Sequence, residues 1–211
     1  MFRTRVKICG ITRVEDALLA CELGADAIGI VMTPTSPRCV PIERARAIRD
    51  ALPAFVDAVV LTHDLPAERV RAIVDAVHPD RVQFHGSEDA AFCEGFGVRY
   101  IKAIGMDGDV DVRTVAAQHG RAVGFVLDGH PPGQQGGRGK TFDWSRIPRD
   151  LDRPILLAGG LNPSNVGEAI RAVRPWAVDL ASGVESAPGI KDAGKLRAFF
   201  AAVHAADAEI A

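Results

Sequence analysis

Eight short runs of apolar and often β-branched residues recur along the chain, and this repetition constrains the fold more than any other feature of the sequence. Several of the runs are almost continuously apolar, which is typical of parallel strands whose outer faces are covered by helices. We therefore predict eight parallel strands. They occupy residues 5–9, 26–32, 55–61, 80–84, 98–103, 122–128, 154–158 and 176–181.

Amphipathic stretches rich in Ala, Leu, Arg and Glu separate the eight runs. In the first, Val14, Ala17, Leu18 and Cys21 follow the i, i+3, i+4 and i+7 spacing of one helix face, which predicts a helix over 13–23. The sixth crossover offers only a short turn, at about 143–147. The other predicted helices occupy 42–51, 66–77, 87–94, 109–118, 163–173 and 191–205.

Eight βα units in one uninterrupted chain predict an α/β protein, a single-domain (β/α)8 barrel over residues 1–211 with its active site at the carboxyl ends of the strands. The alternative is an open doubly wound sheet, but that fold normally has fewer strands and a Gly-rich first turn. The first turn here, G-I-T, has one glycine. The longest loop signal, G-H-P-P-G-Q-Q-G-G-R-G-K at 129–140, follows the sixth strand, and we expect a mobile lid there.

Composition excludes several classes of partner. A net charge of −2 gives no sign of a basic surface for nucleic acid or anionic lipid. No segment approaches the ~20 apolar residues that cross a membrane, and no apolar signal peptide follows M-F-R-T-R, so we expect a soluble cytoplasmic protein. The four cysteines include no CxxC pair, which favours a reducing compartment. Neither HExxH nor a His pair with ligand spacing is present, so we predict no metal.

Two loops at the carboxyl ends of the last strands have the composition of a phosphate site. The seventh run ends in A-G-G-L-N-P and the eighth in S-G-V-E-S, and amides in loops of this kind bind phosphate in many barrels without net basic charge. The glycines could instead only form tight turns, but their occurrence in both loops favours phosphate. The predicted phosphate-binding residues are Gly159, Gly160, Ser182 and Gly183.

Cys9 and Asp128 end the first and sixth runs, so both are expected at the barrel mouth. A buried cysteine is usually core filler, but a thiol beside a helix start could have a lowered pKa and act as a base or nucleophile. Asp128 follows four uncharged residues and precedes a Pro-Gly loop, which disfavours a helix cap. Burial could raise the pKa of its carboxyl enough for a general acid.

Three further residues are candidates for binding a ligand. Arg38 lies between turn-forming residues in T-P-T-S-P-R, and its guanidinium suits a carboxylate, although it could equally be a solvated side chain. Gln83 and His85 end the fourth run in V-Q-F-H-G and could line the pocket, or serve the packing of the barrel.

Seven segments, taken in order, resemble the phosphoribosylanthranilate isomerase family, and the resemblance runs from about residue 5 to residue 200. It implies an Amadori rearrangement of N-(5-phosphoribosyl)anthranilate in tryptophan biosynthesis, with no metal or organic cofactor. The segments are K-I-C-G-I-T, S-P-R, V-Q-F-H-G, L-D, G-G-R-G-K-T-F-D-W, L-A-G-G-L-N-P-x-N-V and S-G-V-E-S-x-P-G-x-K-D.

The resemblance also implies roles for residues. Cys9 matches the general base of the family and Asp128 its general acid. Arg38 matches the arginine that meets the anthranilate part of the ligand, and Asp179 an acid of the eighth strand near the ligand. The glycines and serine of the last two loops match the phosphate site. The expected partner is a small phosphosugar-anthranilate substrate, and the protein is expected to be a monomer or a homodimer.

Two alternatives stay open. One is an isomerase of a related phosphoribosyl compound such as an aminoimidazole, although the first strand then should offer an aspartate where this chain has Cys9. The other is a paralogue that binds a phosphosugar without catalysis, which the presence of both Cys9 and Asp128 disfavours.

Overall fold

Eight parallel strands form a closed barrel in the computed structural model, which describes residues 3–130 and 141–210. Strand order follows the sequence, and the first strand closes the ring by pairing with the last, with Lys7 opposite Asp179. The predicted barrel is confirmed. Its strands are β1 (Arg5–Ile8), β2 (Ala27–Val31), β3 (Asp57–Thr62), β4 (Arg81–Phe84), β5 (Tyr100–Gly105), β6 (Phe125–Asp128), β7 (Ile155–Leu157) and β8 (Ala177–Leu180).

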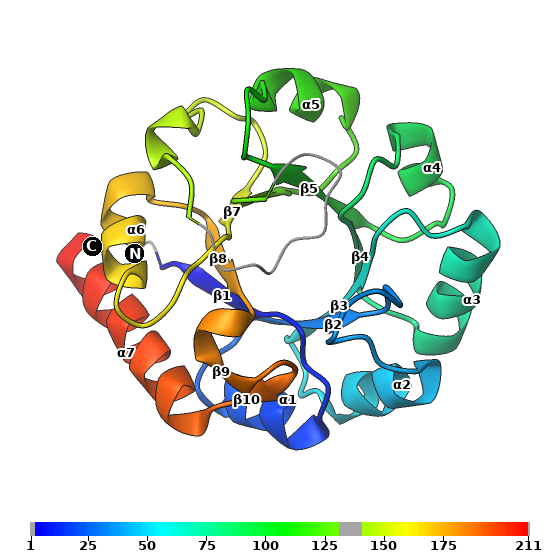
Figure 1. The fold of residues 1–211 in the computed structure, drawn as a ribbon, viewed down its shortest axis with the longest axis horizontal. Helices are drawn as coiled ribbons and strands as arrows, with labels where there is room; N and C mark the ends of the chain where they lie inside the picture. Colours follow the sequence, from blue (N-terminus) through cyan, green and yellow to red (C-terminus); the bar gives the residue numbers. More distant parts are fainter. Residues whose placement is uncertain (1–2, 131–140, 211) are drawn as a thin grey trace.

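Helices surround the barrel as an outer ring (Figure 1). The predicted bounds of the second helix are confirmed, and most of the others differ by one to three residues at an end. The last helix extends five residues beyond the predicted 191–205. The helices are α1 (Val14–Glu22), α2 (Ile42–Ala51), α3 (Ala67–Val77), α4 (Ala90–Glu94), α5 (Val112–Gln118), α6 (Val166–Val173) and α7 (Ala193–Ile210).

Helix α4 is shorter than the predicted 87–94, because the residues before it have other partners. The buried carboxylate of Glu88 accepts hydrogen bonds from the amides of Asp64 and Gly86 and from the ammonium of Lys102. Asp89 then caps the helix, its side chain accepting from the amide of Phe92 at 2.8 Å.

The crossover between β6 and β7 contains no α-helix in its described part. A single 3-10 turn, η1 (Trp144–Arg146), lies where the short turn at 143–147 was predicted. Of the lid predicted at 129–140, residues 131–140 lie outside the described residues.

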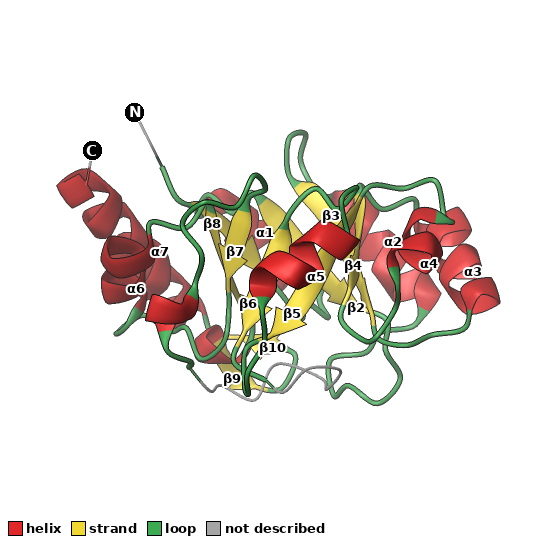
Figure 2. Ribbon diagram, turned by 90° about the horizontal axis from the view of Figure 1, so that it is seen from above, coloured by secondary structure: helices red, strands yellow, loops and turns green. Residues whose placement is uncertain are grey.

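Apolar side chains pack inside the barrel below a cleft at the carboxyl ends of the strands. The interior cluster includes Ile101, Val126 and Leu156, all nearly inaccessible to solvent. Beyond β8 the chain forms a short 3-10 turn, η2 (Ser182–Val184), and an antiparallel hairpin of β9 (Glu185–Ala187) and β10 (Ile190–Lys191). Figure 2 shows this hairpin at the end of the barrel opposite the N-terminus. No helix in the described ranges is long and apolar enough to cross a membrane.

Candidate active site

A cleft with about 750 Å³ of space between protein atoms opens at the carboxyl ends of the strands. Nine of the ten residues predicted for the site line it. The tenth, Gly183, is the next residue in the chain after Ser182. The other lining residues come mainly from the ends of β2, β3, β7 and β8. The predicted residues in the lining are Cys9, Arg38, Gln83, His85, Asp128, Gly159, Gly160, Asp179 and Ser182.

Cys9 directly follows β1 and is 8% exposed. Its amide donates to the carbonyl of Leu180 at 2.8 Å, which continues the pairing of β1 with β8 by one residue. Burial raises the pKa of the thiol, an effect that the positive charges of Lys7, Lys191 and Arg38 oppose but do not overcome. Any lowering of this pKa by a nearby helix start does not outweigh burial. Helix α1 begins only at Val14, and burial dominates.

A buried ion pair lies one layer below Cys9. Lys7 Nζ donates to Asp179 Oδ2 at 2.8 Å, and both side chains are almost completely buried. Burial alone would lower the pKa of Lys7, but Asp179 and the Cys9 sulfur raise it, and the net shift is upward. The pair keeps a positive charge close to the thiol.

Gly29 on β2 provides the space for this arrangement. A Cβ at that position would lie 2.9 Å from the Cys9 sulfur and 3.1 Å from Lys7 Nζ. Any side chain there would push into both groups.

Asp128 ends β6, on a different side of the mouth from Cys9, with β7 and β8 between them. Burial raises the pKa of its carboxyl, with Asp179 adding to the effect and His130 and Lys7 opposing it. His130 Nε2 lies 3.9 Å from the carboxylate. The raised pKa favours a carboxyl that carries a proton available for transfer.

Besides Cys9 and Asp128, the cleft is lined by polar side chains from β4 and β8 and from the residue that follows β4. Gln83 is completely buried, and neither its amide oxygen nor its amide nitrogen has a hydrogen-bond partner among the described residues. The second carboxylate oxygen of Asp179 is equally without a partner in that part of the chain. Burial, with the charges of His130 and Lys7, lowers the pKa of His85 well below its usual value, so its imidazole is neutral. Buried polar groups of this kind require partners, and hydroxyl groups of a ligand would supply them.

The two predicted phosphate loops lie against each other. A Cβ on Gly183 would come 2.0 Å from the carbonyl oxygen of Leu161, so only glycine allows this approach. Gly159 and Gly160 both have positive φ angles, 85° and 65°. Ser182 and Gly183 are the first residues of η2, and the first amides of a helical turn have no partner within it. Backbone amides at the start of a helical turn are a group to which anions can bind.

Arg38 lies at the edge of the cleft with its side chain 12% exposed. Its guanidinium forms two hydrogen bonds with the carboxylate of Glu185, a residue for which the sequence suggested no role. Lys191 was missed as well, although both residues lie in the S-G-V-E-S-x-P-G-x-K-D segment. Lys7 was the third residue that the sequence reasoning missed. Its position two residues before Cys9 could have revealed it, because alternate side chains of a strand share one face.

One group of three side chains has ligand atoms close enough together to hold a metal ion. His85, Asp128 and His130 each offer a ligand atom, and these atoms lie within 4.8 Å of one another. The absence of a metal in the reaction stays a prediction.

Comparison with known proteins agrees with this geometry. The family model described as N-(5'phosphoribosyl)anthranilate (PRA) isomerase matches residues 6–202. An N-(5'-phosphoribosyl)anthranilate isomerase of Xanthomonas euvesicatoria is 49% identical, covering 98% of this chain and 96% of the relative. One of Stenotrophomonas maltophilia is 47% identical, with coverages of 99% and 97%.

Solved structures agree as well. The isomerase of Thermotoga maritima superposes with a TM-score of 0.87 at 41% identity, covering 96% of this chain and 99% of that one. A second isomerase structure, in complex with reduced 1-(o-carboxyphenylamino)-1-deoxyribulose 5-phosphate, gives a TM-score of 0.84 at 38% identity, with the same coverages. The resemblance expected from the sequence motifs is confirmed, and the chain belongs to the N-(5'-phosphoribosyl)anthranilate isomerase family.

Proposed function

We propose that this chain, folded as one domain over residues 1–211, converts N-(5'-phosphoribosyl)anthranilate to 1-(o-carboxyphenylamino)-1-deoxyribulose 5-phosphate, a step of tryptophan biosynthesis. The observation that carries the proposal is one cleft that contains a thiol, a carboxyl with a raised pKa and two glycine-rich loops suited to an anion. Family membership supports the same reaction.

Asp128 acts as the general acid in the first step. Its proton passes to the ring oxygen of the ribose, and the bond from that oxygen to C1′ breaks with its electron pair going to oxygen. The lone pair of the anthranilate nitrogen then forms a C1′=N double bond, which gives an open-chain iminium ion. The raised pKa of Asp128 supports this role, because it keeps the proton on the carboxyl to a higher pH than in an ordinary aspartate.

Cys9 acts as the general base in the second step. Its thiolate removes the proton from C2′, and the electron pair of that C–H bond forms the C1′=C2′ bond and neutralises the iminium. The enol then loses its hydroxyl proton while C1′ gains one, which yields the ketone. Lys7, Arg38 and Lys191 support the thiolate, because their positive charges favour its ionised form against the cost of burial.

Other residues hold the substrate at its two ends. Gly159, Gly160, Ser182 and Gly183 bind the phosphate, and Arg38 binds the carboxylate of the anthranilate ring. Fixing both ends leaves the reacting carbons between acid and base, the kind of positioning that supplies much of an enzymatic rate.

Gln83, Asp179 and His85 meet the ribose hydroxyl groups. Their buried polar atoms, several of them without a partner in the described structure, support this assignment.

The proposal also includes the cofactor requirement, the location and the oligomeric state expected from the sequence. The reaction needs no metal or organic cofactor, the protein acts in the cytoplasm, and it is a monomer or a homodimer. A Thermotoga maritima isomerase is described as dimeric. Sedimentation velocity of this protein distinguishes the two states.

The test is to follow the fluorescence of phosphoribosylanthranilate after adding purified protein. Rapid loss of the signal supports the proposal. Conversion of a phosphoribosyl aminoimidazole compound in its place supports the related isomerase. Tight binding of both compounds without turnover supports a binder.

A further inference from the structure

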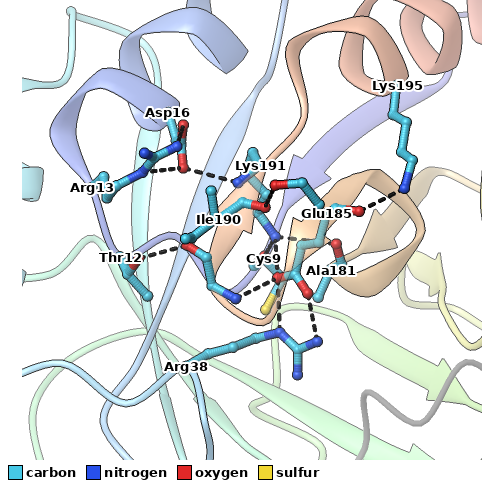
Figure 3. A network of polar contacts seen from close by, with 12 residues as sticks. Cys9, Thr12, Arg13, Asp16, Arg38, Ala181, Glu185, Ile190, Lys191 and Lys195 are labelled. Atoms are coloured by element: carbon cyan, nitrogen blue, oxygen red, sulfur yellow. Dashed lines mark hydrogen bonds and ion pairs between the residues drawn. The ribbon is translucent and has the colours of Figure 1, made fainter.

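The β9–β10 hairpin connects the two parts of the cleft that hold the thiol and Arg38. Glu185 is the first residue of β9 and Lys191 the last of β10, and their side chains meet inside a network of polar contacts (Figure 3). Lys191 Nζ donates to Glu185 Oε1 at 2.9 Å, and both side chains are at least 95% buried.

Glu185 fixes the plane of the Arg38 guanidinium. Nε of Arg38 donates to Oε1 at 2.9 Å and Nη2 donates to Oε2 at 2.7 Å, so the carboxylate occupies one edge of the planar group. Nη1, and the second N–H of Nη2, form a different edge that Glu185 does not use. Because Arg38 lines the cleft, this second edge can receive another carboxylate.

The stem of Arg38 passes over Gly10, where a Cβ would lie only 2.4 Å from Arg38 Cδ. Glycine at position 10 therefore leaves the space that the Arg38 stem occupies.

Lys191 connects the same carboxylate to the residue that carries the thiol. Its ammonium donates to the backbone carbonyl of Cys9 at 2.6 Å and to that of Ala181 at 3.1 Å. Its side chain is 0% exposed. It thus fixes the backbone at the ends of both β1 and β8.

The charges in this cluster do not cancel. One carboxylate, that of Glu185, is shared by two cations, Arg38 and Lys191. Burial would raise the pKa of Glu185, but the two cations outweigh it and lower that pKa, so the carboxylate is ionised. Burial lowers the pKa of Lys191, and Glu185 opposes this effect. With Lys191 protonated, the three side chains together carry one positive charge at the edge of the cleft, which favours an anionic group on the ligand.

We propose that Glu185 and Lys191 are positioning residues, which hold the Arg38 guanidinium with one edge open to the ring carboxylate of the substrate and fix it relative to the backbone of Cys9. The inference rests on the proposed roles of Arg38 and Cys9. It explains why two charged side chains are buried at the ends of a hairpin that is otherwise largely exposed.

The test compares two ligands that differ only in the carboxylate. One is reduced 1-(o-carboxyphenylamino)-1-deoxyribulose 5-phosphate, and the other carries a phenyl ring in place of the carboxyphenyl ring. Calorimetry gives the two dissociation constants, and their ratio is the carboxylate preference. In Glu185→Gln, which keeps the shape of the side chain but loses its charge, we expect this preference to fall by about tenfold or more. Binding of the phenyl compound should change less than about threefold.

A purely structural role predicts a different pattern, in which both ligands lose affinity equally and the preference is unchanged. That result would overturn the proposal. If Glu185→Gln does not fold, Glu185→Asp keeps the charge but shortens the reach to Arg38 and Lys191, and the same loss of preference is expected. Lys195→Ala is the matched control, because the Lys195 ammonium donates to the backbone carbonyl of Glu185, at 2.7 Å, and not to its carboxylate.

Arg38→Lys separates this inference from the proposed function. If Arg38→Lys leaves the carboxylate preference intact, the proposed role of Arg38 is wrong. If Arg38→Lys loses the preference while a folded Glu185 variant keeps it, the positioning role alone is wrong.

Discussion

Lys7 and Asp179 lie directly opposite each other in the pairing of β1 with β8, and their side chains form a 2.8 Å ion pair inside the barrel. Cys9 follows Lys7 by two positions and shares its face of the strand. The buried ion pair of Lys7 and Asp179 therefore lies inside the barrel directly below the Cys9 thiol. Each member supplies the counter-charge that the other needs in this buried position.

Removing one member of this pair should cost much more than removing both. Lys7→Met leaves the carboxylate of Asp179 buried without its counter-charge, and we expect a loss of about 3–5 kcal/mol in the free energy of unfolding. The double variant Lys7→Met with Asp179→Leu should recover most of that loss. Urea unfolding measures both. Equal losses in the single and double variants would contradict the ion pair as the cause.

Asp128 should make the stability of the protein depend on pH. Burial raises the pKa of its carboxyl, so the native state keeps a proton that the unfolded chain has released. The resulting stabilisation is complete below the unfolded pKa and is lost as the pH rises through the native pKa. Asp128→Asn has no proton to lose there.

The stability of Asp128→Asn relative to wild type should therefore increase as the pH rises from the unfolded pKa of about 4 through the raised native pKa. Urea unfolding at a series of pH values measures this difference. The difference in stability measured below and above this pH range serves as the baseline. A difference that is constant across the range would contradict the raised pKa.

The Cys9 thiol should react slowly at neutral pH in the ligand-free protein. Burial raises its pKa, and only the thiolate reacts with iodoacetamide. We expect the alkylation rate of the peptide that contains Cys9, followed by mass spectrometry, to be still rising above about pH 9. Cys93, whose pKa burial raises to about 12, provides an internal comparison. A plateau below neutral pH would instead indicate a thiolate stabilised by its cationic neighbours.

Gly183→Ala should damage phosphate binding selectively. The new Cβ would lie 2.0 Å from the Leu161 carbonyl oxygen, so the two loops must move apart. Loss of one hydrogen bond to a charged phosphate, about 1.5 kcal/mol or more, weakens binding by about tenfold or more. Calorimetry with ribose 5-phosphate measures the effect. Gly120→Ala, which has open space around the new Cβ, is the control, and equal weakening in both variants would contradict the argument.

Local patterns in the sequence predict most of what places the site. The apolar runs give each strand, and a residue at the end of a parallel strand must lie at the barrel mouth, which brings Cys9, His85 and Asp128 together. Gly159 and Gly183 are also visible locally, because glycine just after the end of a strand indicates close backbone approach.

Partners far apart in the chain are not predictable in the same way. Arg38 and Glu185 are separated by 147 positions, and Lys7 and Asp179 by 172, so their meeting depends on the closure of the barrel and on strand register. The direction of the Cys9 pKa shift could not be read from the sequence for a related reason. The sequence shows the neighbouring helix, but burial is a property of the folded chain.

The central claim is that Cys9 and Asp128 act as base and acid on one substrate bound in one cleft. The most direct measurement is the rate of phosphoribosylanthranilate loss with wild type, Cys9→Ala and Asp128→Asn, each shown to be folded and to bind ribose 5-phosphate. We expect each variant to lose about 10²–10⁴-fold in kcat with phosphate binding unchanged. Rates near wild type in both variants would contradict the account.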